Sequence, residues 1–189
     1  GLMIGALARC AYVMNDQRYL KEAGRAADAV FEVRNGLWSL EEGGRLMRSA
    51  RHGKASGASG ILEDYAFMIQ GLLEVHRAES AAELGNDGRR FAQVERLEAL
   101  VCAQFVGKGG ELFDTRAGER DLFVRARNTH DGAIPCGTSV MIHNWLDMAE
   151  LTGEARYTQL AMGALTAISK AVHESPVGTI NSTRALLLS

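Results

Sequence analysis

The chain has little of several features that would restrict its fold or its location. It holds only two prolines and three cysteines among 189 residues, and no two cysteines form a CxxC pair. This composition argues against a disulfide-stapled secreted scaffold and fits a reducing compartment. No apolar run approaches the roughly 20 residues that a membrane-spanning helix requires, and no signal peptide opens the sequence. We therefore expect a cytoplasmic protein with no membrane partner.

A surplus of charge of one sign is also missing. The formal net charge is −2, and lysine and arginine are scattered along the sequence, so nothing indicates a nucleic-acid partner. The most basic stretch, residues 45–54, fits a solvated loop, with contact to a phosphate or a carboxylate as the alternative. No second histidine stands at a metal-ligand spacing, and no phosphate- or dinucleotide-binding glycine motif follows a strand. We therefore predict no metal site and no cofactor.

What is present is a helical repeat. An arginine followed by an aromatic residue recurs just inside three predicted helices, at Arg18-Tyr19, Arg90-Phe91 and Arg156-Tyr157. Each pair opens an amphipathic helix with apolar residues spaced three and four apart, and another apolar helix precedes each one. The sequence thus predicts three helix hairpins and the start of a seventh helix after residue 176. The predicted helices are residues 2–14, 17–34, 62–77, 89–105, 135–151 and 154–173.

Two non-helical insertions separate the hairpins. In the first, residues 37–38 and 46–47 flank a glycine-rich turn and predict a short β-hairpin, whereas residues 54–60 predict a flexible loop. In the second, which spans about residues 109–134, we expect two short strands at residues 111–114 and 122–124.

Helix hairpins in series form either a solenoid or a closed α/α toroid. Long insertions with short strands suit the rim of a toroid, and the first helix of each pair is apolar on more sides, as an inner ring would be. We therefore predict an all-α fold whose hairpins form part of an (α/α)6 toroid with β-hairpin insertions at the rim. Both ends lie inside apolar runs, so we expect residues 1–189 to be one partial domain of about three and a half hairpins in a longer protein.

Polar residues open the predicted inner helix at residue 62. Glu63 and Asp64 either cap the helix and offset its dipole, or one of them faces the mouth of the toroid as a general acid or base or as a ligand for a substrate hydroxyl. Tyr65 is either a core residue or a stacking wall for a sugar.

A second polar group precedes Pro135, a residue that suits the first position of a helix. His130 and Asp131 are either a solvent-exposed histidine and a turn aspartate, or an acid/base pair across the mouth from Glu63 and Asp64. Two carboxylates on separate elements are the minimum for glycoside hydrolysis, and their separation decides the chemistry. Cys136, near the same helix start, is either a buried small residue or a nucleophile.

Four segments, in this order, resemble the C-terminal part of thioredoxin-domain-containing proteins related to spermatogenesis-associated protein. They are LEDYAF (62–67), ELFDT (111–115), DGAIPCGTS (131–139) and LTGEARY (151–157). The resemblance implies an α/α toroid similar to six-hairpin glycosidases and N-acylglucosamine 2-epimerases. It also implies that a thioredoxin-like domain accompanies this part in the full-length protein.

The resemblance also marks positions of a site. The motif positions are Glu63, Asp64, Tyr65, Asp114, Asp131, Gly132, Pro135, Gly137, Ser139 and Asn144. The chain departs from the family pattern at Cys136 and Thr138, where the family usually has serine and asparagine.

Two functions follow as hypotheses. In the first, the toroid binds or transforms a carbohydrate-like small molecule by hydrolysis or epimerisation. Its expected catalytic residues are Glu63, Asp64, His130 and Asp131, and its expected substrate-binding residues are Tyr65, Asp114, Ser139 and Asn144. In the second, the toroid is a non-catalytic module that binds a substrate or a partner for the thioredoxin-like domain, and the carboxylates are helix caps.

Overall fold

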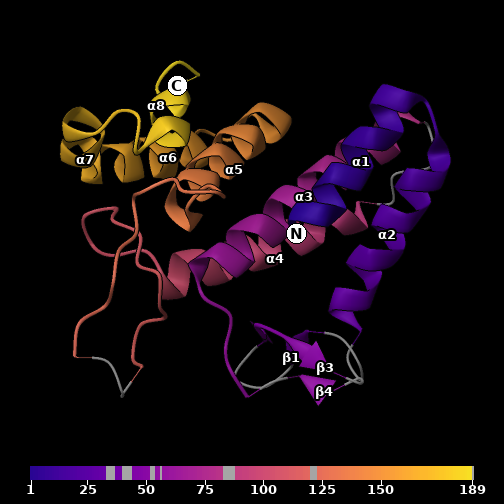
Figure 1. Ribbon diagram of the computed structural model, residues 1–189, viewed down its shortest axis with the longest axis horizontal. Coiled ribbons are helices and arrows are strands. Elements are labelled where there is room, and N and C mark those ends of the chain that lie inside the picture. Colours follow the sequence, from indigo (N-terminus) through magenta and orange to yellow (C-terminus); the bar gives the residue numbers. More distant parts are fainter. Residues whose placement is uncertain are drawn as a thin grey trace. The chain divides into compact units, whose positions relative to one another are not determined.

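The computed structural model is largely helical, with two small antiparallel hairpins (Figure 1), which confirms the all-α prediction. It describes residues 1–32, 37–39, 44–51, 54–55, 57–82, 88–119 and 123–188. The helices are α1 (Leu2–Met14), α2 (Gln17–Phe31), α3 (Leu62–Ala81), α4 (Arg89–Gln104), α5 (Gly137–Thr152), α6 (Ala155–Ala167), α7 (Ser169–Glu174) and α8 (Ile180–Ala185). The strands are β1 (Trp38–Ser39), β2 (Arg45–Leu46), β3 (Ala50–Arg51) and β4 (Lys54–Ala55). None of the described helices has both the length and the apolar composition needed to cross a bilayer.

The chain divides into two compact units, Gly1–Leu100 and Val101–Ser189. In the first unit, α1 packs against both α2 and α3 (Figure 1). In the second unit, α5 packs against both α6 and α8. The helices α3 and α5 bury residues on every side, including Tyr65, Phe67, Ile69 and Leu72 of α3. They are therefore the centres of the two cores.

The first hairpin of helices begins and ends largely as its local signals predict. α1 matches the predicted range and ends at Asn15, whose backbone is left-handed (φ 50°, ψ 43°). Asp16 caps α2 by accepting a hydrogen bond from the Arg18 N–H at 3.0 Å. α2 ends at Phe31, because the backbone is extended at Glu32 (φ −65°, ψ 116°). Residues 33 and 34, the predicted end of this helix, lie outside the described residues.

The first insertion contains more strand structure than predicted. β1 pairs with β2, with Trp38 opposite Leu46, which confirms the predicted hairpin. The prediction of a loop over residues 54–60 is wrong in part, because β4 pairs with β3 and Met47 forms a further bridge with Ser59. Trp38 is buried, with its ring 4.5 Å from the Arg96 guanidinium. This contact holds the β1–β2 hairpin against α4.

The second Arg-aromatic pair has a structural role in the first unit. The Arg90 side chain is buried, and its guanidinium binds Asp28 of α2 at 2.6 Å, Glu79 of α3 at 3.5 Å and the Gly24 carbonyl at 3.3 Å. Phe91, next to it, contacts the ring of His76 at a centroid distance of 5.6 Å. Arg90 therefore joins three helices around one buried positive charge.

Helix boundaries in the second unit and at α3 differ from the predictions. α3 continues four residues beyond Arg77 through Ala78 and Ala81, since alanine is the best helix former. α5 starts at Gly137 rather than at Pro135, because Cys136 is the residue that caps it. The predicted helix 154–173 is divided at Ile168, whose backbone is not helical (φ −109°, ψ 5°).

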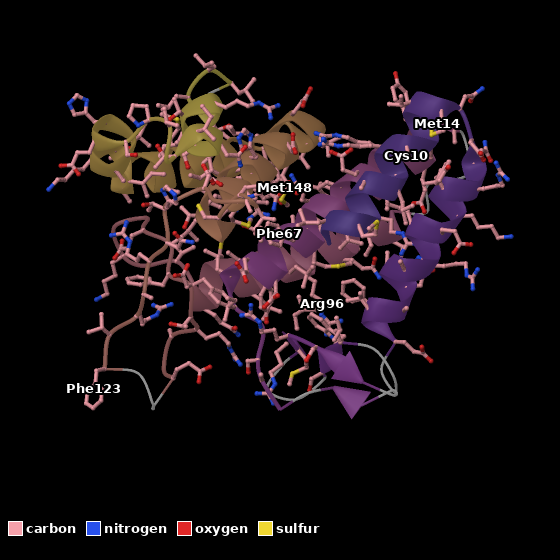
Figure 2. The ribbon with its side chains drawn as sticks, in the orientation of Figure 1. Cys10, Met14, Phe67, Arg96, Phe123 and Met148 are labelled. Carbon is pink, nitrogen blue, oxygen red and sulfur yellow. The ribbon has the colours of Figure 1, made fainter. Side chains whose placement is uncertain are left out.

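The two strands predicted in the second insertion are absent from its described residues, where only one bridge joins Val106 to Leu112. A side chain holds part of the insertion instead of a sheet. The Arg125 guanidinium donates to the carbonyls of Gln104 (2.8 Å) and Thr115 (2.6 Å) and lies 4.1 Å from the centroid of the Phe113 ring. It therefore joins the end of α4 to residue 115 of the insertion. Phe123, part of the second predicted strand, projects from an exposed loop (Figure 2).

Candidate functional site

The first candidate site lies at the start of α3. Asp64 is the third residue of the helix, and its Oδ2 accepts a hydrogen bond from the Ile61 N–H at 2.9 Å. This is the carboxylate half of a capping box, while Ile61 has no side-chain acceptor for the other half. The structure therefore gives Asp64 the helix-cap role that was one of its two predicted alternatives.

Burial raises the pKa of the Asp64 carboxyl, and this effect exceeds the opposing hydrogen bond from Ile61 and the attraction of Arg48. The ionised carboxylate is consequently less favourable in the folded chain than in the unfolded one. The contribution of this group to stability is therefore fully present at low pH, and it is lost as the pH rises through the raised pKa.

Glu63 forms an ion pair with Arg48 of the basic stretch at residues 45–54. Its Oε1 accepts an ion-paired hydrogen bond from Arg48 Nη2 at 2.9 Å, and the two side chains are 30% and 47% exposed. Arg48, in the basic stretch at residues 45–54, thus pairs with a carboxylate of the chain itself. The pair places a half-exposed donor and acceptor beside one another at the N-terminal end of α3.

Tyr65 fixes the loop that carries Arg48. Its side chain is fully buried, and its hydroxyl oxygen accepts a hydrogen bond from the Leu46 N–H at 3.0 Å. The Gly60 N–H donates to the Leu46 carbonyl at 2.8 Å, and a Cβ at position 60 would lie only 2.9 Å from that oxygen. The Tyr65 ring therefore belongs to the core, with no exposed face on which a sugar could stack.

The second candidate site is a hydrogen-bond network around Asp131 in the second unit. Its Oδ1 accepts from the Cys136 N–H (3.0 Å) and from the Ser139 hydroxyl (2.7 Å), and its Oδ2 accepts from the Asn181 N–H (2.9 Å). One carboxylate thus holds residues at the starts of both α5 and α8.

Ser139 and Asn181 complete this network. The Asn181 side-chain amide donates to the Ser139 hydroxyl at 3.1 Å, and the Asn181 carbonyl lies 2.9 Å from Nε2 of His143. The sequence predicted Ser139 and Asp131 as site residues, and the structure brings them together. Asn181 was missed, because nothing in its local sequence relates it to an aspartate fifty residues earlier.

Cys136 belongs to the same helix start. Its sulfur accepts from the Ser139 N–H at 3.4 Å, which makes it the cap of α5. Burial is the main cause that raises the pKa of the Cys136 thiol. A buried thiol with a raised pKa is a poor nucleophile, so the structure favours the small buried residue over the nucleophile.

The other predicted residues of the second unit lie apart from this network or at its edge. The His130 N–H donates to Asn128 Oδ1 at 3.0 Å. The Asp114 N–H donates to the Ala126 carbonyl at 2.9 Å, which holds two parts of the insertion together. Asn144 is fully buried, and its amide nitrogen lies 3.9 Å from the sulfur of Met141.

The predicted catalytic residues are divided between the two units. Glu63 and Asp64 belong to the first unit, and His130 and Asp131 belong to the second. Within the described part of the chain, no three histidine, cysteine, aspartate or glutamate side chains gather as a metal ion would require.

Several known proteins are similar in sequence to this chain. No protein-family model matches it. It is 27% identical to spermatogenesis-associated protein 20 of Rattus norvegicus over 98% of its own length and 23% of that protein. It is 28% identical to the Homo sapiens protein of the same name, over 98% of this chain and 24% of the relative. An uncharacterized protein of Caenorhabditis elegans is 25% identical over 94% of this chain.

These matches show homology to spermatogenesis-associated protein 20 over nearly the whole chain. They agree with the resemblance that the four sequence segments indicated. The chain spans about a quarter of the length of these relatives.

Proposed function

We propose that the chain is a non-catalytic binding module, part of an α/α toroid, that recognises a carbohydrate-like small molecule at the start of α3. The observation that carries the non-catalytic assignment is the use of the aspartate oxygens. Asp131 accepts three hydrogen bonds through both oxygens, and Asp64 accepts one from the backbone. The oxygens that accept these bonds hold the backbone and side chains at the starts of α3, α5 and α8, which is a structural role for both carboxylates.

The toroid part of the proposal is supported by the packing within each unit. α1 and α3 lie side by side, and α2 packs against both of them. In the second unit α5, whose residues are buried on every side, packs against the more exposed α6. Inner helices that contact one another, each with an outer partner, are the packing that a ring of helix hairpins requires.

The ligand class is supported by the Arg48–Glu63 pair. A guanidinium presents fixed N–H donors, and a carboxylate presents only acceptors. Side by side and half exposed, the two groups suit adjacent hydroxyl groups, each of which both donates and accepts. The full-length protein would then be cytoplasmic and as long as the relatives. In it, this module would bind a substrate for the thioredoxin-like domain that the resemblance implies.

One observation favours a second candidate, an enzyme with glycoside hydrolase or epimerase chemistry. Burial raises the pKa of Asp64, as in carboxylic acids that serve as general acids near neutral pH. In that case Asp64→Asn would abolish turnover of a sugar that the variant still binds.

The test is a thermal-shift screen of residues 1–189 with neutral monosaccharides, sugar phosphates and short glycans, followed by calorimetric titration of any hit. We expect one sugar to stabilise the wild type and to bind Glu63→Gln and Arg48→Gln about ten-fold more weakly, the loss expected from one charged hydrogen bond. The matched controls are Glu22→Gln and Arg25→Gln, which break an exposed ion pair of 3.0 Å on α2. A screen without any stabilising sugar, or a hit that the two site variants bind unchanged, would reject the carbohydrate assignment.

A further inference from the structure

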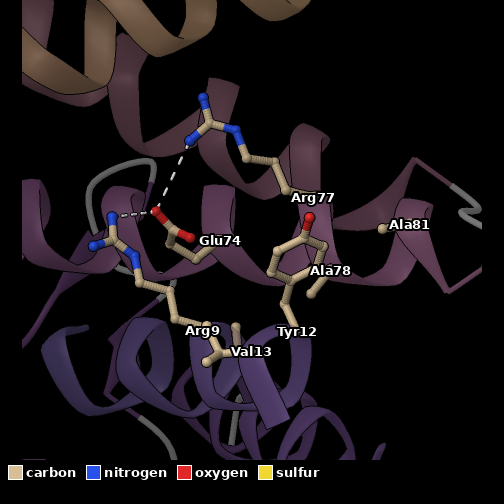
Figure 3. A pocket seen from close by; sticks show the side chains of 8 residues that line it. Arg9, Tyr12, Val13, Glu74, Arg77, Ala78 and Ala81 are labelled. Carbon is tan, nitrogen blue, oxygen red and sulfur yellow. Dashed lines mark hydrogen bonds and ion pairs between the residues drawn. The ribbon is translucent and has the colours of Figure 1, made fainter. Parts of the chain in front are cut away.

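The first unit has two hollows of different chemical character. The groove between α1 and α3, shown in Figure 3, is lined mainly by alanines and by Tyr12 and Val13. The other is a cavity of about 590 Å³, whose described lining comes from α2, from Glu79 of α3 and from the start of α4. Most of these lining residues are charged, so this second hollow, which we call the α2–α4 cavity, suits a polar ligand.

Three cations form a row along the α2 side of the cavity. Arg18, Lys21 and Arg25 are spaced three and four positions apart, and all three are exposed. Side chains at these spacings lie on one face of a helix, with about 5–6 Å between neighbouring Cβ atoms. An anion in the cavity can therefore contact two cations of the row at once.

The cations of this row keep donors that no described group uses. Arg18 binds Asp16 through Nε and Nη2, which leaves Nη1. Arg25 binds Glu22 through Nη1, which leaves Nε and Nη2. Lys21 has no partner in the part of the chain that the structure describes. Because guanidinium and ammonium groups only donate, the complementary ligand is a group that only accepts, such as a phosphate.

The two carboxylates in the described lining are bound by other arginines. The buried Arg90 guanidinium lies 2.6 Å from Asp28 Oδ1 and 3.5 Å from Glu79 Oε1. Arg89 Nη1 lies 3.2 Å from the same Asp28 oxygen. These carboxylates therefore do not occupy the donors of the row on α2.

Two helices also begin at this cavity. Gln17 and Arg89, the first residues of α2 and α4, both line it. The N-terminal end of a helix carries the positive end of its dipole, which favours a negatively charged ligand nearby.

We propose that the α2–α4 cavity binds a small molecule with two phosphate groups, such as pyrophosphate or a sugar bisphosphate. A row of three cations can hold two phosphates, one between each neighbouring pair. No aromatic side chain is among the described lining residues, so none of them would stack a nucleotide base. The inference does not depend on the carbohydrate site, since it uses none of the residues of that site.

The test is calorimetric titration of residues 1–189 with inorganic pyrophosphate, fructose bisphosphate, inorganic phosphate and citrate at one ionic strength. We expect pyrophosphate to bind about five-fold or more tightly than phosphate, because two phosphates engage the row instead of one. Citrate, a multivalent anion without phosphate, should bind more weakly than pyrophosphate. Fructose bisphosphate distinguishes the sources, since tighter binding of it than of pyrophosphate identifies a sugar bisphosphate as the ligand.

Variants test the location. Lys21→Gln should weaken pyrophosphate binding about five-fold, the upper end for an exposed charged contact. The matched control is Lys108→Gln, at an exposed lysine of the second unit that likewise has no partner among the described residues, and it should bind as the wild type does. Arg25→Gln should weaken binding of pyrophosphate but not of a neutral sugar. Glu63→Gln should leave pyrophosphate binding unchanged, which separates this cavity from the carbohydrate site.

Arg18→Gln provides a second variant of the row if Lys21→Gln alters the circular dichroism spectrum. Equal losses in Lys21→Gln and Lys108→Gln, or no loss in either, would mean an adventitious ion only and would overturn the proposal. No binding, tighter binding of citrate, or no advantage of two phosphates over one would also overturn it. So would tighter binding of a uridine oligonucleotide than of pyrophosphate, because the ligand would then be RNA.

Discussion

Replacing Asp131 with alanine should lower the free energy of unfolding of the second unit by about 4–5 kcal/mol, the sum of three hydrogen bonds to a charged group at about 1.5 kcal/mol each. The variant removes the acceptor of the Cys136 and Asn181 N–H groups and of the Ser139 hydroxyl. Hydrogen bonds to a charged group contribute roughly 1.5–3 kcal/mol each, and the lower end applies here because Asp131 is only partly buried.

Asp131→Asn should cost about half as much. An asparagine offers one oxygen and one amide nitrogen, so in either orientation it turns a donor toward one of the two backbone N–H groups. The expected order of stability is therefore wild type, Asp131→Asn and Asp131→Ala. Glu174→Ala, which removes an exposed pair with Lys170 at 3.8 Å, should change the stability by less than about 0.5 kcal/mol.

Each unit contains one tryptophan, which permits a separate measurement. In a Trp38→Phe background, the fluorescence of Trp145, fully buried on α5, follows urea unfolding of the second unit alone. If Asp131→Ala unfolds at the same urea concentration as the Glu174→Ala control, the carboxylate does not hold α5 and α8, and the structural role assigned to it is wrong.

Three further outcomes are expected. The stability of the first unit, measured by Trp38 fluorescence, should fall as the pH rises from about 4 through the raised pKa of Asp64. Asp64→Asn should flatten this pH dependence, because asparagine keeps a hydrogen-bond acceptor and cannot ionise. If the variant has the same pH dependence as the wild type, the burial of this carboxyl is contradicted. Cys136 should resist alkylation in the folded chain at pH 8 while Cys10 and Cys102 react, as peptide mass mapping will show; early labelling of Cys136 would refute its burial. Arg90→Ala should destabilise the first unit by about 3–5 kcal/mol in urea, since it breaks a buried ion cluster; a loss below 1 kcal/mol would show that water replaces the guanidinium.

Sequence reasoning succeeded where neighbours along the chain decide the structure. The bounds of α1 and the start of α4 follow from apolar spacing and turn residues, and Asp16 caps α2 as its position predicts. The β1–β2 hairpin follows from apolar pairs around a glycine-rich turn. Each of these signals acts within a few residues, so it is complete in the sequence.

The predictions were wrong where contacts between residues far apart in the sequence decide the structure. The two strands expected in the second insertion are absent from its described residues, where Arg125 binds the carbonyls of Gln104 and Thr115. The division of the predicted helix at Ile168, a buried residue in a run without proline, has no local signal either. Packing can override helix propensity, since propensity contributes only a few tenths of a kcal/mol per residue.

For the candidate site, the sequence by itself determined which residues are polar at the helix starts, because carboxylates there interrupt otherwise apolar runs. Only the tertiary structure decided what each one does. Glu63 binds Arg48 across fourteen intervening residues, and Asp131, which precedes α5, binds Asn181 of α8. A carboxylate near a helix start has the same local sequence whether it caps the backbone or faces a ligand, and the groups that meet its oxygens come from parts of the chain that only folding brings close.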